Sequence, residues 1–255
     1  VTGTDELVRI AEQNGKTGVF LSVLGFGMGN HNDAMLEQIS GKGNGNYAFI
    51  DTEAEARKVL IEQMTGTLIT IAKDVKIQVE FNPQRVAAYR LIGYENRILA
   101  AQDFNDDKKD AGEIGAGHTV TALYEIVPAG AEGGVAIPPV DDLKYQQKGQ
   151  ANEAAESGEL LTLKMRYKQP DGDTSSKLEF PLCDEGRRFG QASKDFRFAA
   201  SVAAFGMLLR DSAHKGNASY AGVQEIATEA ASGDTSGYRD EFLKMLAKAK
   251  ELAGR

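Results

Sequence analysis

Residues 4–72 alternate helix-like and strand-like hydrophobic patterns, in the order that is typical of an α/β fold. A helix of about three turns is predicted from Thr4, with acidic residues in its first turn. The nearly continuous apolar run Val19–Leu24 indicates a parallel strand covered on both faces, and Tyr47–Ile50 indicates a second strand. A short helix over Asp33–Ser40 connects them, so the segment is predicted to form a βαβ unit.

A longer helix is predicted over Glu53–Ile71, with Thr52 as its cap, because its apolar residues recur at helical spacing. Gly66 weakens this helix, since glycine costs about 1 kcal/mol relative to alanine in a helix interior. The β-branched neighbours Thr65 and Thr67 favour a kink or the close approach of another backbone at this point. We therefore expect Gly66→Ala to destabilise the protein.

From Lys73 the hydrophobic period changes to that of a strand with one wet face. Apolar and polar residues alternate over Val75–Phe81, so Lys76 is expected to face water. Residues 128–158 are rich in Gly, Ala, Pro and acidic residues and are predicted to form a long loop. Four further strands are predicted, at residues 86–94, 118–127, 160–168 and 177–182.

Three helices are predicted at the C-terminal end, over residues 194–213, 220–231 and 238–252. Ser193, Ser219 and Ser236 stand before them, where a serine side chain can accept a hydrogen bond from a free backbone N–H. The first and last helices carry apolar stripes, which core packing explains better than a cofactor site.

These patterns together predict an α+β fold class. Residues 1–72 are expected to form a partial α/β segment of Rossmann-like type. Residues 73–255 are expected to form an antiparallel, β-sandwich-like domain, with a C-terminal helical bundle over residues 192–252.

Charge and composition narrow the choice of partners. The chain carries 37 acidic and 29 basic side chains, and its net charge of -8 repels nucleic acid and anionic lipid. No basic run interleaves with aromatic residues, so no nucleic-acid partner is expected.

Cys183 is the single cysteine, which excludes an internal disulfide, and it is expected to be a buried, unreactive thiol. The chain opens at Val1 without a targeting leader, and we expect it to be a fragment.

The segment Gly25–Gly29 follows a predicted strand and resembles the glycine-rich turn of dinucleotide-binding proteins. Asn30 replaces the third glycine of that motif, and the helix that follows is shorter than those that bind a pyrophosphate. A plain strand-to-helix turn is therefore the favoured interpretation. A nucleotide-binding enzyme that uses Gly25–Gly29 is the alternative function.

Candidate catalytic and metal-binding residues are few. Asp103, Asn105 and Asp107 have the spacing that opens a calcium loop, but Lys108 occupies the position at which a glycine makes the sharp turn. They are weak metal candidates, and neither a tight metal site nor a cofactor is expected. The 3 histidines are far apart in sequence and assemble no catalytic cluster, so the protein is not expected to be an enzyme.

Two stretches of the α/β region carry a resemblance to a known family, residues 19–29 and residues 43–51. Both are similar to the closing part of a von Willebrand factor type A domain, so the resemblance implies that residues 1–72 are the C-terminal half of such a domain. Residues 96–97, 103–107 and 112–126 resemble the C-terminal extension of bacterial secreted or lipid-anchored members.

Members of this family bind an adhesion metal through the string Asp-x-Ser-x-Ser together with a distant Thr and Asp. The nearest strings here, residues 173–177 and 234–238, both lack the final Ser. The resemblance therefore implies a non-enzymatic protein–protein interaction or adhesion module of the bacterial cell envelope, or a secreted one, without the metal-ion-dependent adhesion site. Its protein ligand is unknown.

Two surfaces are expected to make these contacts. The loop at the carboxyl end of the first strand is expected to face a ligand through Gly27, Asn30 and Asn32. The strand edge near Val19–Leu24 is expected to be exposed and apolar, and to self-associate or accept a strand from another chain.

Overall fold

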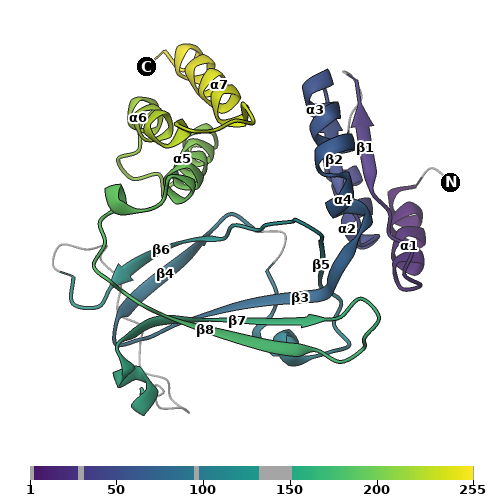
Figure 1. Cartoon of the computed structure of the whole chain (residues 1–255), viewed down its shortest axis with the longest axis horizontal. Helices are drawn as coiled ribbons and strands as arrows, with labels where there is room; N and C mark the ends of the chain where they lie inside the picture. The colour runs from purple at the N-terminus through teal and green to yellow at the C-terminus, as the bar shows by residue number, and fades with distance from the viewer. Residues whose placement is uncertain (1–2, 28–31, 95–97, 132–150, 255) are drawn as a thin grey trace. The chain divides into compact units, whose positions relative to one another are not determined.

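The computed structural model describes residues 3–27, 32–94, 98–131 and 151–254 (Figure 1). The chain divides into two compact units. Unit 1 contains residues 1–80, 99–120 and 162–181, and unit 2 contains residues 81–98, 121–161 and 182–255. Helices and mainly antiparallel strands occur together, which confirms the α+β class. The predicted domain boundary at residue 72 stays a prediction.

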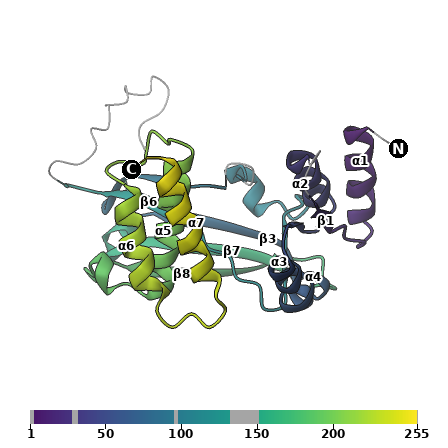
Figure 2. The same ribbon diagram turned by 90° about the horizontal axis from the view of Figure 1, so that it is seen from above.

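The α/β part of unit 1 consists of α1 (Thr4–Gly15), β1 (Val23–Phe26), α2 (Asp33–Lys42) and β2 (Tyr47–Ile50). β1 and β2 pair in parallel with Val23 opposite Tyr47, which confirms the predicted βαβ unit. The first strand begins at Val23 rather than Val19, because β2 begins only at Tyr47 and leaves residues 19–22 with no partner strand there. α1 and α2 pack against each other (Figure 2).

The predicted helix Glu53–Ile71 is broken into shorter pieces, so this prediction was wrong in its second half. The pieces are α3 (Glu53–Arg57), a π-helical turn (Lys58–Glu62) and α4 (Met64–Leu68). Thr52 caps α3 as expected, by accepting a hydrogen bond from the N–H of Glu55. Ile69 already has an extended backbone, and its carbonyl accepts a hydrogen bond from Ala116 N at 2.8 Å, which ends the helix.

The close backbone approach that was predicted at Gly66 is present. A Cβ atom added to Gly66 would lie 3.1 Å from the carbonyl oxygen of Ala116. A Cβ atom added to Gly115 would lie only 1.5 Å from the carbonyl oxygen of Gly66. Two glycines therefore allow the backbone of α4 to lie directly against the end of β5 (Gly112–Gly115).

Unit 1 also holds most of a four-stranded sheet with the strand order β5-β3-β7-β8. β3 spans Thr70–Phe81, β7 spans Glu159–Lys168 and β8 spans Ser176–Cys183. β3 and β5 pair antiparallel with register shifts on both sides of Ala72, and β5 was not predicted. The predicted strand 118–127 is shorter, since β6 spans Leu123–Pro128.

Two predictions for this sheet were wrong. Lys76 is buried, with an exposed fraction of 3%, whereas Ile77 is 47% exposed. Lys76 is covered by a later segment of the chain, because its ammonium donates to the carbonyl oxygen of Asp106. The predicted alternation holds further along the strand, where Glu80 is exposed and Phe81 is half-buried. Cys183 is exposed rather than buried, because every residue of the edge strand β8 is exposed.

Unit 2 contains an antiparallel pair of strands, β4 (Val86–Ile92) and β6, and three C-terminal helices. The helices are α5 (Lys194–Leu209), α6 (Tyr220–Ala231) and α7 (Tyr238–Leu252), close to the predicted ranges. Ser193 and Ser219 cap α5 and α6 as predicted. In the predicted loop 128–158, residues 132–150 lie outside the described residues and Glu153–Ser157 form a 3-10 turn.

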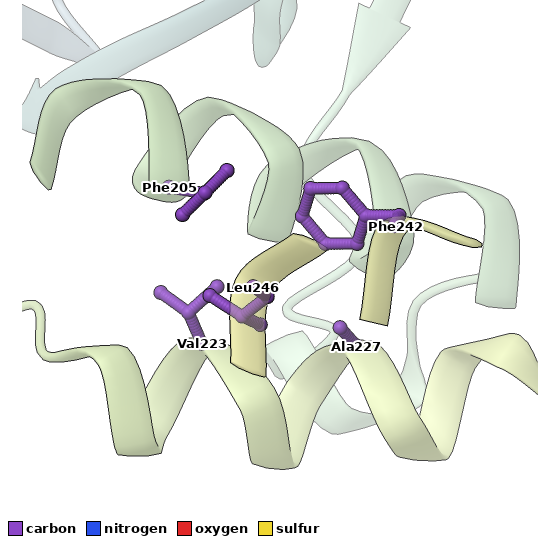
Figure 3. Packing of buried hydrophobic residues seen from close by; sticks show 5 residues of the cluster. All are labelled: Phe205, Val223, Ala227, Phe242 and Leu246. Carbon is purple, nitrogen blue, oxygen red and sulfur yellow. The ribbon is translucent and has the colours of Figure 1, made fainter. Parts of the chain in front are cut away.

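The helical core of unit 2 is small and well defined (Figure 3). The ring of Phe242 from α7 packs edge-on against Phe205 and Phe198 of α5, with ring centroids 5.5 Å and 5.3 Å apart. These contacts confirm packing for part of each apolar stripe, whereas Leu209 of α5 and Met245 of α7 are exposed. The buried residues of this cluster are Phe205, Val223, Ala227, Phe242 and Leu246.

Candidate functional site

The loop that was predicted to face a ligand is only partly described. Gly27 has a φ of 90°, in the turn after β1, and Asn30 lies outside the described residues. Asn32 caps α2, because its side-chain oxygen accepts a hydrogen bond from Met35 N at 3.1 Å. The side chain of Asn32 therefore has a structural role, as the N-cap of α2.

An acidic residue stands at the N-terminus of α2, where a nucleotide phosphate would have to bind. Asp33 accepts a hydrogen bond from the hydroxyl of Tyr47, and this bond is the main cause that raises the pKa of Tyr47 to about 12. A phosphate bound to the free N–H groups of α2 would meet the charge of Asp33. This arrangement disfavours nucleotide binding at the turn.

The three weak metal candidates are each bound to other side chains. Asp103 forms an ion pair with Lys109 at 3.1 Å. Arg166 of β7 brings the other two together, since it donates to Asn105 at 3.3 Å and to Asp107 at 3.0 Å. Hydrogen bonds from the Ser175 hydroxyl and then Arg166 lower the pKa of Asp107. Asn105 and Asp107 are thus held by Arg166 of the sheet, whereas Asp103 is paired with Lys109 close by in the sequence.

The two strings nearest to the adhesion motif also have local roles. Ser175, from the first string, donates to Asp107, while Asp173 lies 3.9 Å from the ammonium of Lys73. In the second string, Asp234 accepts hydrogen bonds from Ser236 and from Arg239 N, at the start of α7. These bonds, with that from Ser236 first, lower the pKa of Asp234 to about 2.

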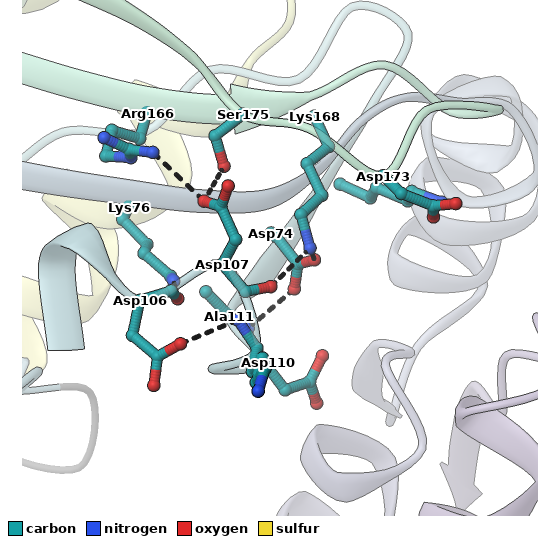
Figure 4. A network of polar contacts seen from close by, with 12 residues as sticks. Asp74, Lys76, Asp106, Asp107, Asp110, Ala111, Arg166, Lys168, Asp173 and Ser175 are labelled. Atoms are coloured by element: carbon teal, nitrogen blue, oxygen red, sulfur yellow. Dashed lines mark hydrogen bonds and ion pairs between the residues drawn. The ribbon is translucent and has the colours of Figure 1, made fainter.

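Residues 105–111, here called the acid loop, are fixed to the sheet of unit 1 by buried lysines (Figure 4). Lys76 of β3 donates its ammonium to the carbonyl oxygen of Asp106. Lys168 of β7, which is 8% exposed, donates to the carbonyl of Asp107 at 2.7 Å and to the carboxylate of Asp74 at 2.6 Å. The bond to Asp74 is the main cause that raises the pKa of Lys168. Lys168 is therefore paired with a carboxylate, whereas Lys76 donates to a backbone carbonyl.

Three acidic side chains lie close together beside Lys168. They come from β3, the acid loop and β5. Asp74, Asp110 and Glu113 each have a carboxylate oxygen within 4.8 Å of the others, and they are here called the carboxylate cluster. Oε2 of Glu113 is buried and has no hydrogen-bond partner among the described residues. Burial, followed by the charges of Asp74 and Asp110, raises the pKa of Glu113 to about 7. Burial is also the first cause that raises the pKa of Asp110.

The carboxylate cluster opposes the ionisation of Glu113. Like charges at this separation repel each other, and this repulsion adds to burial in raising the pKa of Glu113. Lys168 already supplies the positive charge that Asp74 requires, and we assign no metal to the cluster. Sequence reasoning missed it, because Asp74 lies far from Asp110 and Glu113 in the sequence. The acidic residues from Asp106 to Glu113 were the available signal.

Comparison with known proteins places the chain in a family. The sequence model of the family described as "Uncharacterized protein YfbK, C-terminal" matches residues 66–252. The chain belongs to this family. It is 43% identical over 231 residues to "Uncharacterized protein YfbK" of Escherichia coli (strain K12), and the match covers 91% of this chain.

The same match covers 39% of the Escherichia coli protein, so the chain spans well under half the length of this relative. No solved structure matches the chain significantly. Among the described residues, no helix has the length and apolar character that crossing a membrane requires.

Proposed function

We propose that the chain is a non-enzymatic protein–protein interaction or adhesion module of the bacterial cell envelope. In this proposal residues 1–72 are the C-terminal half of a von Willebrand factor type A domain, and the remaining residues are its C-terminal extension. The parallel β1–α2–β2 arrangement supports the first part, since such domains are built on parallel strands. The envelope location rests on the resemblance to bacterial secreted and lipid-anchored members.

The observation that carries the proposal is an apolar strand edge in unit 1. β1 and β2 form a two-stranded parallel sheet, and Phe26 of β1 is 63% exposed. Val19, in the segment that leads into β1, is 59% exposed. We call these residues the apolar edge; its exposed members are Val19, Phe20, Leu21, Leu24 and Phe26.

Such an edge favours a partner for two physical reasons. Two strands alone are marginally stable in water, and parallel strands are normally covered on both faces. The free backbone N–H and C=O groups of an edge strand can pair with a strand from another chain, while exposed apolar side chains gain free energy on burial. If residues 1–72 are the C-terminal half of a type A domain, the other half of that domain would supply neighbouring strands for this edge. For this chain alone, a second copy can supply such a strand.

The polar side chains that were candidates for chemistry support a non-catalytic function. Asp107, Ser175 and Asp234, which lie in or beside the nearest adhesion-like strings, are engaged in contacts within the fold. The nucleotide-binding alternative is disfavoured by the carboxylate of Asp33 at the N-terminus of α2.

Light scattering on the full chain from micromolar to near-millimolar concentration tests the proposal. We expect the average molar mass of the wild type to rise with concentration. The molar mass of Phe26→Lys should stay that of a monomer, because a charge at the edge opposes strand pairing. The matched control is Leu252→Lys, at an apolar residue of α7 that is 77% exposed, which should associate like the wild type. A wild type that stays monomeric throughout, or a Phe26→Lys that associates equally well, would overturn self-association through the apolar edge.

A further inference from the structure

We propose that a cavity in unit 2 binds a small organic carboxylate, whose charged end is held by the guanidinium of Arg85. The cavity has a volume of about 290 Å³ and is here called the unit 2 cavity. It lies where the turn between β3 and β4 meets the end of β6, the start of β7 and the residue that follows β8. All its described lining residues belong to unit 2, so the inference is independent of the proposed function, which concerns the apolar edge of unit 1.

The walls of the unit 2 cavity are held in place by Asn82, at the start of the turn between β3 and β4. Its side-chain amide donates to the carbonyl oxygens of Ala155 and Glu159, at 2.8 Å in each case. Its side-chain oxygen accepts a hydrogen bond from Gln84 N, and its backbone carbonyl accepts one from Arg85 N, both at 3.0 Å. The turn that carries Arg85 is therefore fixed against the start of β7, so the walls are formed before a ligand binds.

Arg85 brings a positive charge to the cavity that no described residue neutralises. Among the described residues its guanidinium forms neither an ion pair nor a hydrogen bond, whereas Arg90 of the next strand is paired with Glu125. A Cβ atom added to Gly158 would lie 3.7 Å from Nη2 of Arg85, so the guanidinium lies beside a residue that has no side chain to cover it. The planar fork of N–H donors is thus free to bind a carboxylate through two parallel hydrogen bonds.

A carboxylate borders the same cavity without neutralising Arg85. Asp184 lines the cavity, and the two side chains form no ion pair with each other. Oδ1 of Asp184 accepts a hydrogen bond from Gly186 N at 2.8 Å, and Oδ2 has no partner among the described residues. An ammonium group of the ligand would find an acceptor in this carboxylate, so the arrangement favours a carboxylate that also carries an amine, as an α-amino acid does.

Apolar walls and a small volume define the rest of the ligand. Ile126, Pro128 and Leu160 line the cavity. Ile126 stands opposite Tyr89 in the β4–β6 pair, and the ring of Tyr89, which is 60% exposed, packs on Phe81 with ring centroids 4.4 Å apart. Ligand pockets usually have volumes of about 300–1,000 Å³, so a cavity at the lower limit of this range takes a molecule of amino-acid size rather than a nucleotide. The ligand is therefore a small carboxylate with an apolar side chain.

Ligand-observed NMR titration of the full chain tests the cavity with three probes. L-leucine carries the carboxylate, the amine and an apolar side chain, 4-methylpentanoate lacks the amine, and L-leucine amide lacks the carboxylate. We expect the two carboxylates to bind at concentrations up to about 10 millimolar and the amide not to bind. Tighter binding of leucine than of 4-methylpentanoate would assign the ammonium to Asp184 and an amino acid as the ligand, whereas equal binding would leave the carboxylate as the group that is recognised.

Variants of Arg85 show whether binding occurs in the unit 2 cavity. Arg85→Met removes the guanidinium and keeps an apolar stem, so the dissociation constant of leucine should rise about tenfold or more. Arg85→Lys keeps the charge without the planar fork and should bind with intermediate affinity. The matched control Arg9→Met, at an exposed arginine of α1 in unit 1, should bind like the wild type.

Three results would overturn the proposal. They are the absence of binding by both carboxylates, binding of the amide as tight as that of leucine, and an Arg85→Met variant that binds leucine like the wild type. If Arg85→Met does not fold, Ala129→Leu replaces it, because a larger side chain at this lining residue fills the cavity without changing a charge. This variant should lose leucine binding, and unchanged binding would contradict the proposal.

Discussion

The close approach of α4 and β5 makes a sharp prediction for two glycines. Gly66→Ala should lower the free energy of unfolding, although the residue lies in a helix, where alanine is normally favoured by about 1 kcal/mol. The new Cβ atom would lie 3.1 Å from the carbonyl oxygen of Ala116, and that carbonyl belongs to a backbone segment hydrogen-bonded to Ile69. Overpacking of this kind costs about 1–3 kcal/mol, so we expect a net loss of about 1 kcal/mol.

Gly115→Ala should be far more damaging than Gly66→Ala. Its Cβ atom would lie 1.5 Å from the carbonyl oxygen of Gly66, whereas ordinary contact begins at 3.4 Å. α4 would have to separate from β5, so we expect a loss of more than about 3 kcal/mol or a failure to fold. The control is Gly41→Ala, at a helical residue of α2 with no atom within 4 Å of the new Cβ, which should be neutral or slightly stabilising.

Denaturant melts of the three variants and the wild type decide the matter. The denaturant midpoint should be highest for Gly41→Ala, lower for Gly66→Ala and lowest for Gly115→Ala. The dependence of the unfolding free energy on denaturant concentration should not change. A midpoint of Gly66→Ala above that of the wild type would contradict this prediction. The backbone at Ala116 would then move away from the new Cβ atom without lowering the free energy of unfolding.

Three further predictions concern the charged groups of unit 1. Glu113→Gln should stabilise the protein by about 1–2 kcal/mol at roughly pH 8.5, a figure reduced for partial exposure, and have little effect below pH 5, as urea melts at the two pH values will show. Lys168→Met leaves the carboxylate of Asp74 unpaired and should cost about 3 kcal/mol, whereas Lys177→Met, at an exposed ion pair, should change stability by less than about 0.5 kcal/mol. Titration calorimetry with calcium or magnesium should be flat, and binding below about 10 micromolar would contradict this and point to the carboxylate cluster or to Asp103, Asn105 and Asp107.

Local patterns in the sequence were sufficient for the parts of the fold that depend on neighbouring residues. Parallel β1 and β2 follow from continuous apolar runs, and Ser193 and Ser219 cap the helices for which their position predicts it. The contact at Gly66 was also signalled locally, by its β-branched neighbours.

Features that depend on irregular or long-range geometry were not accessible in this way. The burial of Lys76 depends on its contact with Asp106 of the acid loop, and no pattern within β3 predicts that contact. β5 is a four-residue strand, too short to show a period. The carboxylate cluster requires β3 and β5 to be neighbours, and this pairing cannot be read from spacing along the chain.

The central claim, that the apolar edge is an interaction surface, is tested most directly by amide hydrogen exchange of β1 as a function of protein concentration. The account predicts that protection of Val23–Phe26 rises with concentration in the wild type and stays constant in Phe26→Lys. Association detected by light scattering without any change in the protection of Val23–Phe26 would place the interface elsewhere and contradict the claim.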